Sequence, residues 1–164
     1  MKVLGIIPAR GGSKGIPGKN IKILGRKPLL QYTVESAMAS RLLSRTILSS
    51  DDPQIIEVGE KLELEVPFLR PKNLSDDNTT SLEVIQHALN FFLSKNEVFD
   101  AVCLLQPTTP FRQKHLIDKS IEKFLEGNFD SLISVRKIPV EYNPHWVFEE
   151  EQGKLKLATG EKEI

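Results

Sequence analysis

The sequence predicts an α/β domain with a mostly parallel β-sheet that is covered by helices on both faces. Short apolar runs alternate along the chain with longer segments in which apolar residues recur at helical spacing. The first run, residues 2–8, is apolar almost throughout, which is typical of a strand buried on both faces of a parallel sheet. Because parallel strands need crossover connections, this alternation indicates βαβ units.

The predicted elements follow one another in a regular order. Pro28 begins the first helix, where its missing backbone donor costs little. Thr80 and Glu83 have the spacing of a capping box at the start of the third helix, and Gly127 with Asn128 ends the fourth. We expect strands at residues 2–8, 45–49, 66–69, 100–105 and 131–135, and helices at residues 28–38, 52–62, 82–93 and 114–125.

The alternation stops after residue 135. Residues 142–148 and 155–157 are typical of two short strands around a charged turn. We therefore expect an α/β domain at residues 1–135, followed by an excursion and the end of the chain at residues 136–164.

Charge and composition exclude several classes of protein. Lys and Arg (22) balance Asp and Glu (22) within 164 residues, which argues against a general nucleic-acid binder and against attraction to a membrane surface. No apolar run approaches the roughly 18 residues that span a bilayer, and the N-terminus has no signal-peptide pattern. The single cysteine, Cys103, excludes an internal disulfide and a cysteine-based zinc site, and the histidines lack metal-ligand spacing. The spacing of these residues therefore predicts no metal ligands in the chain. The low cysteine content fits a reducing cytoplasm.

The stretch directly after the first strand, residues 10–20, is rich in glycine and lysine. Ligands of open α/β sheets bind at the carboxyl ends of the strands. Glycines let backbone N–H groups approach an anion, and Arg10, Lys14 and Lys19 add cations, so the stretch suits a polyphosphate. Neither the P-loop nor the dinucleotide fingerprint fits, because Ser13 stands where each requires glycine. A flexible turn with solvated lysines is the alternative.

Two further loops follow strands at the same edge of the predicted sheet. Residues 106–112 offer an amide, hydroxyls and a guanidinium, which are groups that bind a polyhydroxy substrate. The sequence is equally compatible with an alternative in which residues 106–112 only connect a strand to a helix and Arg112 forms a surface ion pair. In residues 69–81, Thr80 is first of all a helix cap. Asp51 is the carboxylate nearest to the expected site.

Several motifs closely resemble those of the acylneuraminate cytidylyltransferases, the CMP-sialic acid synthetases. The longest is IPARGGSKGIPGKN at residues 7–20; the others, in matching order, are G-x-x-PL at 25–29, SSDD at 49–52, LRP at 69–71, SDD at 75–77 and LQPTTPFR at 105–112. The resemblance covers essentially the whole chain and implies a Rossmann-like nucleotide-diphospho-sugar transferase fold with a small β excursion near the C-terminus. The related 3-deoxy-manno-octulosonate enzymes fit less well, because their first loop differs and they carry an acidic motif at the position of residues 106–108.

The resemblance implies an enzyme that couples CTP to a nine-carbon 2-keto sugar acid and releases pyrophosphate. Sialic acid is the first expectation, and legionaminate and pseudaminate are the alternatives. Arg10, Lys14 and Lys19 would act on the triphosphate as the catalytic cations. By the same resemblance, the other residues of the site would be Gly11, Gly12, Ser13, Asn20, Arg70 and Ser81 for the nucleotide and Gln106 for the sugar acid.

The resemblance also implies Mg²⁺ and a homodimer formed through residues 136–157. Family members usually run further, and their later part carries the aspartate pair that holds magnesium; nothing before Ile164 matches it. We therefore expect a truncated chain without those metal ligands. A CTP-binding domain without turnover is the alternative to an active transferase, and a small-molecule kinase is opposed by the failed P-loop spacing.

Overall fold

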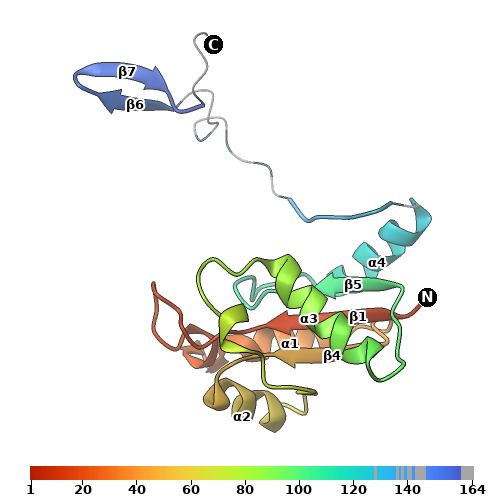
Figure 1. Ribbon diagram of the computed structural model, residues 1–164. Helices are drawn as coiled ribbons and strands as arrows, with labels where there is room; N and C mark the ends of the chain where they lie inside the picture. The colour runs from red at the N-terminus through yellow and green to blue at the C-terminus, as the bar shows by residue number, and fades with distance from the viewer. Residues whose placement is uncertain (128, 136, 138, 140–141, 143–146, 160–164) are drawn as a thin grey trace. The chain divides into compact units, whose positions relative to one another are not determined.

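The computed structural model describes the chain except for residues 128, 136, 138, 140–141, 143–146 and 160–164, and it describes residues 151 and 155 by their backbone alone (Figure 1). By its internal contacts the chain divides into two units, Met1–Phe129 and Asp130–Ile164, and each is described by itself. The division falls after Phe129, whereas the sequence placed the domain boundary after residue 135.

Three parallel strands form the sheet of the first unit, in the order β4-β1-β5. In the register, Ile6 of the central strand lies opposite Ile47 on one side and Leu104 on the other, so the carboxyl ends of all three strands lie at one edge. The predicted segment at residues 66–69 appears as isolated parallel bridges beside β4, from Ile47 to Glu65 and from Ser50 to Leu69. The strands are β1 (Val3–Pro8), β4 (Arg45–Ser49) and β5 (Ala101–Leu104).

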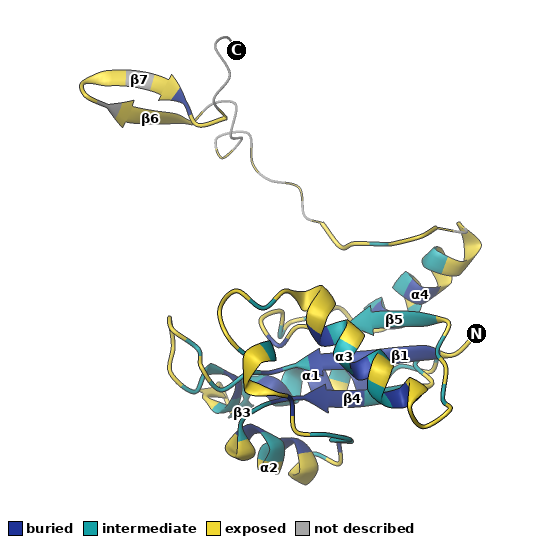
Figure 2. Ribbon diagram, viewed as in Figure 1, coloured by how far each residue is buried: buried dark blue, intermediate teal, exposed yellow. Residues whose placement is uncertain are grey.

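Helices cover both faces of this sheet, as predicted. Side chains alternate between the faces along β1. Val3 and Ile7 pack with residues of α1, α2 and α4, whereas Leu4 and Ile6 pack with Ala88 and Phe92 of α3. Figure 2 shows the buried residues along β1 and β4. The helices are α1 (Leu29–Met38), α2 (Pro53–Lys61), α3 (Ser81–Leu93) and α4 (Leu116–Glu126).

Capping residues fix the starts of α2 and α3 at the edge of the sheet where the strands end. The side chain of Asp52 accepts hydrogen bonds from the backbone N–H groups of Gln54 and Ile55 at the start of α2. Thr80 and Glu83 form the predicted capping box of α3. Small elements complete the unit: the 3₁₀ helices η1 (Lys19–Ile21) and η2 (Lys72–Leu74), and the paired strands β2 (Ile23–Leu24) and β3 (Lys27–Pro28).

The prediction of a strand at residues 131–135 is wrong. This segment forms no strand, and Ile133 and Val135 are 80% and 84% exposed. Its apolar residues Leu132, Ile133 and Val135 favour a strand, but a strand is stable only when a neighbour satisfies its backbone groups. No strand in the described part of the chain pairs with it.

The second unit contains an antiparallel hairpin of β6 (Phe148–Glu151) and β7 (Lys154–Leu157). Gln152 and Gly153 have φ angles of 53° and 75°, a turn that favours glycine. The acidic residues Glu149 to Glu151 therefore lie in a strand, although the sequence analysis assigned them to the turn. The predicted strand residues 143–146 lie outside the described part, and the homodimer stays a prediction. No helix among the described residues is long and apolar enough to cross a membrane.

Candidate functional site

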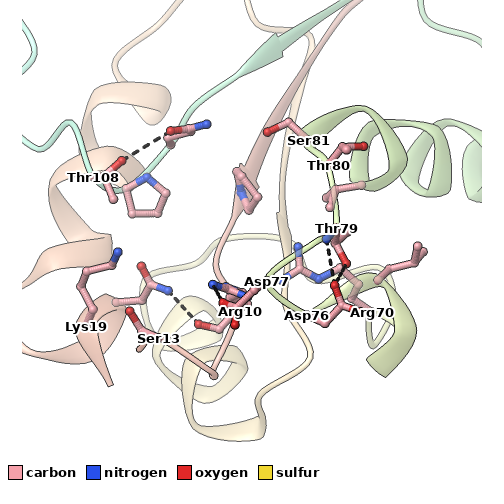
Figure 3. A pocket seen from close by; sticks show the side chains of 16 residues that line it. Arg10, Ser13, Lys19, Arg70, Asp76, Asp77, Thr79, Thr80, Ser81 and Thr108 are labelled. Atoms are coloured by element: carbon pink, nitrogen blue, oxygen red, sulfur yellow. Dashed lines mark hydrogen bonds and ion pairs between the residues drawn. The ribbon is translucent and has the colours of Figure 1, made fainter. Parts of the chain in front are cut away.

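A pocket of about 250 Å³ opens at the carboxyl ends of the strands. Its walls come from the loop after β1, the segment between η2 and α3, and the loop after β5. In the view of Figure 3, Lys19 and Thr108 lie on one side, and Arg70, Thr80 and Ser81 lie on the other. The lining residues are Pro8, Arg10, Ser13, Lys19, Asn20, Arg70, Leu74, Asp76, Asp77, Thr79, Thr80, Ser81, Val84, Gln106, Pro107 and Thr108.

The loop after β1 is shaped by Gly18 and Asn20. Gly18 has a φ angle of 63° and precedes η1, which carries Lys19 and Asn20. Asn20 is buried, and its Nδ2 donates a hydrogen bond to the carbonyl oxygen of Arg10 at 3.0 Å. Lys19 pairs with no carboxylate in the described part of the chain. The loop therefore presents Lys19 to the pocket as a cation that can bind an anionic ligand.

Gly11 is held against the start of α2. Its N–H donates to Oδ1 of Asp51 at 3.1 Å, and an added Cβ would lie 2.3 Å from Oδ2 of Asp52. The amide of Gly11 is thus directed at a side chain of the protein, whereas the sequence analysis expected glycine amides to approach an anion. A Cβ at Gly12 would meet nothing within 4 Å. Close packing therefore requires glycine at residue 11 and leaves residue 12 unconstrained.

Arg70 forms the buried cation of the site. Its side chain is 3% exposed, its Nη2 lies 3.7 Å from Oδ1 of Asp51, and its Nε donates to Oγ of Ser75 at 3.1 Å. Burial lowers the pKa of Arg70, and the charge of Asp51 opposes that shift. The same oxygen of Asp51 thus faces both Arg70 and the amide of Gly11. Asp51 thus links Arg70 to the loop after β1.

Asp77 holds two of the predicted cations. Its Oδ1 lies 2.6 Å from Nη2 of Arg10, and its Oδ2 pairs with Nζ of Lys14. The hydrogen bond from Lys14 and then that from Arg10 lower the pKa of Asp77. In the sequence, Asp77 was noticed only as part of the SDD motif at residues 75–77. Asp76 and Asp77 follow a segment that lies beside β4, and this position near the strand ends could have indicated that Asp77 reaches the site.

Ser81 and Gln106 belong to different walls of the pocket. Ser81 is the first residue of α3, next to the cap Thr80, and Val84 lies one turn further on. The loop of Gln106 is fixed by Arg112, which donates to Oγ1 of Thr33 at 2.8 Å and to the carbonyl oxygen of Gln106 at 2.7 Å. Within the described residues Arg112 forms no ion pair with a carboxylate, so the alternative of a surface ion pair is not observed.

The carboxylates at the strand ends do not fit a magnesium ion by themselves. Asp51 is directed at Gly11 and Arg70, and Asp52 caps α2. The described residues contain no group of three or more acidic, histidine or cysteine side chains that could hold a metal.

The pocket brings together most of the residues that the sequence analysis selected. Lys14 does not line it but reaches its edge through Asp77, and Gly11 and Gly12 also lie outside the lining. The selected residues that line the pocket are Arg10, Ser13, Lys19, Asn20, Arg70, Ser81 and Gln106.

Curated relatives carry the names of cytidylyltransferases and CMP-sugar synthases. A pseudaminic acid cytidylyltransferase of Campylobacter jejuni is 46% identical over 127 residues, covering 77% of this chain and 55% of the relative. A CMP-N,N'-diacetyllegionaminic acid synthase of Legionella pneumophila is 36% identical, covering 89% and 62%. An N-acylneuraminate cytidylyltransferase of Escherichia coli is 38% identical, covering 75% and 30%. The chain thus spans only part of the length of these relatives.

A solved structure supports the fold. A CMP:2-keto-3-deoxy-manno-octonic acid synthetase complexed with CTP has a TM-score of 0.65 at 19% identity, covering 78% of this chain and 49% of that protein. This likeness confirms the Rossmann-like nucleotidyltransferase fold. The family model described as cytidylyltransferase matches residues 4–154, which include every strand and helix of the first unit except the first residue of β1. The chain belongs to the cytidylyltransferase family.

Proposed function

We propose that the chain carries the nucleotide-binding part of an enzyme that joins CTP to a nine-carbon 2-keto sugar acid. In this reaction the anomeric hydroxyl of the sugar replaces pyrophosphate on the α-phosphorus, and a CMP-sugar forms. The observation that carries the proposal is the pocket itself, which combines the cations Arg10 and Lys19 with Asn20, Arg70 and Gln106 at the strand ends.

Charge neutralisation is the contribution of this pocket to the reaction. Nucleotidyl transfer depends mainly on positioning and on stabilising negative charge on the phosphates and on the leaving pyrophosphate. Lys19 and Arg10 supply positive charge at one wall. Leu74 and Val84 add apolar surface near Arg70 and Ser81, and this combination suits a base that needs both stacking surface and hydrogen-bond donors.

The sugar acid is proposed from similarity. Identity is 46% to the relative named for pseudaminic acid and 38% to the Escherichia coli relative named for N-acylneuraminate. This order favours pseudaminate as the acceptor, with sialate next and then legionaminate, whose relative is 36% identical. Gln106 and Thr108 line the pocket after β5 and offer an amide and a hydroxyl to such a polyhydroxy substrate.

The nucleotide is tested by thermal unfolding in the presence of CTP and, as the matched control, ATP. A ligand at 100 times its Kd stabilises the folded state by about 2.7 kcal/mol. We expect a clear rise of Tm with CTP and a much smaller rise with ATP, because both carry a triphosphate and only the base differs. Equal shifts would contradict a cytidine site and leave only a polyphosphate site.

Turnover is tested by pyrophosphate release from CTP with pseudaminate, legionaminate or sialate as acceptor. We expect release with pseudaminate to exceed release with sialate. Binding of CTP without release with any of the three acids would support the alternative of a CTP-binding domain without turnover.

A further inference from the structure

Two cations that the sequence resemblance assigns to the triphosphate already share a partner within the protein. The carboxylate of Asp77 contacts Nη2 of Arg10 at 2.6 Å through one oxygen and Nζ of Lys14 through the other. Figure 3 shows Asp77 beside Arg10 among the residues that line the pocket. A carboxylate with each oxygen on a separate cation occupies the positions that two phosphate oxygens would take.

We propose that Asp77 is a competing anion of the nucleotide site, whose carboxylate must leave Arg10 and Lys14 before a polyphosphate can bind them. The inference rests on the proposed function, because it takes the triphosphate as the ligand of these cations. By competing for Arg10 and Lys14, Asp77 lowers the affinity of the site for polyphosphates and promotes the release of pyrophosphate.

Exposure makes this exchange easy. The side chains of Arg10, Lys14 and Asp77 are 32%, 81% and 36% exposed. Ion pairs with this much solvent contact contribute little, so a ligand that carries several charges displaces one carboxylate readily. A polyphosphate offers more negative charge at the same positions than Asp77 does. The carboxylate returns when the polyphosphate leaves, because it is attached to the wall of the pocket.

The segment that carries Asp77 is kept in place by its neighbour. Oδ1 of Asp76 accepts hydrogen bonds from the N–H groups of Asn78 and Thr79 at 2.9 and 2.8 Å and from Oγ1 of Thr79 at 2.9 Å. Asp76 also lines the pocket, but it forms no ion pair with Arg10 or Lys14. The two adjacent aspartates thus have separate roles: Asp76 closes the turn, and Asp77 holds the cations.

This difference provides a matched control. D77N and D76N each remove one negative charge from the pocket wall, and asparagine at residue 76 keeps the oxygen that closes the turn. Calorimetric titration with inorganic triphosphate, pyrophosphate, CTP and cytidine measures the affinities at one fixed salt concentration. We expect D77N to bind the three polyphosphate ligands about fivefold more tightly, which is the scale of exposed ion pairs. Cytidine binding is expected to stay unchanged, and D76N is expected to gain much less than D77N, because Asp76 forms no ion pair with Arg10 or Lys14.

The contact with Lys14 gives a second measurement. In a K14A background the gain from D77N is expected to shrink, because one of the two contacts is already lost. Unchanged or weaker triphosphate binding in D77N would overturn the inference, and so would an equal gain in D76N, which would indicate a general charge effect. If wild-type protein binds CTP no better than ATP while D77N still tightens inorganic triphosphate, the proposed function fails and the role of Asp77 stands.

Discussion

The pocket is bordered by two ion-paired groups that differ in burial. Arg70 and Asp51 form one group, with side chains 3% and 20% exposed. Arg10, Lys14 and Asp77 form the other, and all three of their side chains are at least 32% exposed. The first group is largely buried, whereas the second is partly exposed to solvent. One site thus combines a fixed, buried charge with charges that can exchange partners.

The electrostatics of the two groups explain the difference. A buried guanidinium has lost its hydration, so it depends on Asp51 and on the oxygen of Ser75. Removing such a partner leaves a charge in a region of low dielectric. Arg10 and Lys14 keep much of their hydration when Asp77 leaves, because water replaces the carboxylate. We therefore expect changes in the first group to affect folding and changes in the second to affect binding.

The largest expected effect follows from Asp51→Ala. This variant removes the charge that faces Arg70 and the acceptor of the Gly11 N–H group. We expect the free energy of unfolding to fall by about 2 to 3 kcal/mol, less than the roughly 3 to 5 kcal/mol that breaking a fully buried pair costs, because Asp51 is partly exposed. Urea denaturation measures the loss. Asp77→Ala is the control, and its unfolding midpoint is expected to match that of the wild type. A similar loss in both variants would contradict the comparison.

The second prediction concerns the backbone that joins the two groups. Gly11→Ala places a Cβ 2.3 Å from Oδ2 of Asp52, whereas Gly12→Ala meets nothing within 4 Å. The Asp52 side chain caps α2, so it cannot move aside without losing those hydrogen bonds. We expect Gly11→Ala to lower stability by about 1 to 2 kcal/mol and to weaken CTP binding. Gly12→Ala is expected to fold like the wild type, and denaturation of both variants by urea tests the pair.

Much of the fold was predictable because its signals are local. The apolar run of β1 and the capping box of Thr80 and Glu83 are patterns within a few residues, and the structure confirms them. The rule that ligands bind where strands end located the loops after β1 and β5 correctly around one pocket. The resemblance then selected individual side chains, such as Asn20, that composition alone would not have distinguished.

The rest depends on contacts between distant residues. Arg10 and Asp77 are 67 residues apart in the sequence, and Gly11 and Asp51 are 40 apart. No periodicity pairs one charge with another over such distances, so the partners of the predicted cations appeared only in the structure. The same reason explains the missing strand at residues 131–135, since a strand pattern does not reveal whether a neighbouring strand is present.

The smallest expected effect is a loss of folding stability at mildly acidic pH. It distinguishes the partly buried His87 from the exposed Asp77, because only His87 titrates in that range. His87 packs edge-on against Phe68, with ring centroids 4.6 Å apart. Its buried Nδ1 has no hydrogen-bond partner in the described part of the chain. Burial, followed by the charge of Arg70, lowers the pKa of His87 below its ordinary value of 6.5. As the pH falls below 6.5, the unfolded chain therefore binds a proton before the folded protein does, and folding stability decreases.

Asp77 does not titrate in this range. Its pKa lies below the ordinary value of 3.8, so its contribution is present at higher pH and is lost only as the pH falls through the lowered pKa. We expect the urea midpoint of the wild type to fall between pH 7.5 and 5.5, and to fall less in His87→Gln, which does not titrate. Asp77→Asn should retain the wild-type decrease, because Asp77 stays ionised throughout the range. A decrease that persists in His87→Gln and disappears in Asp77→Asn would overturn the assignment of the pH dependence to His87.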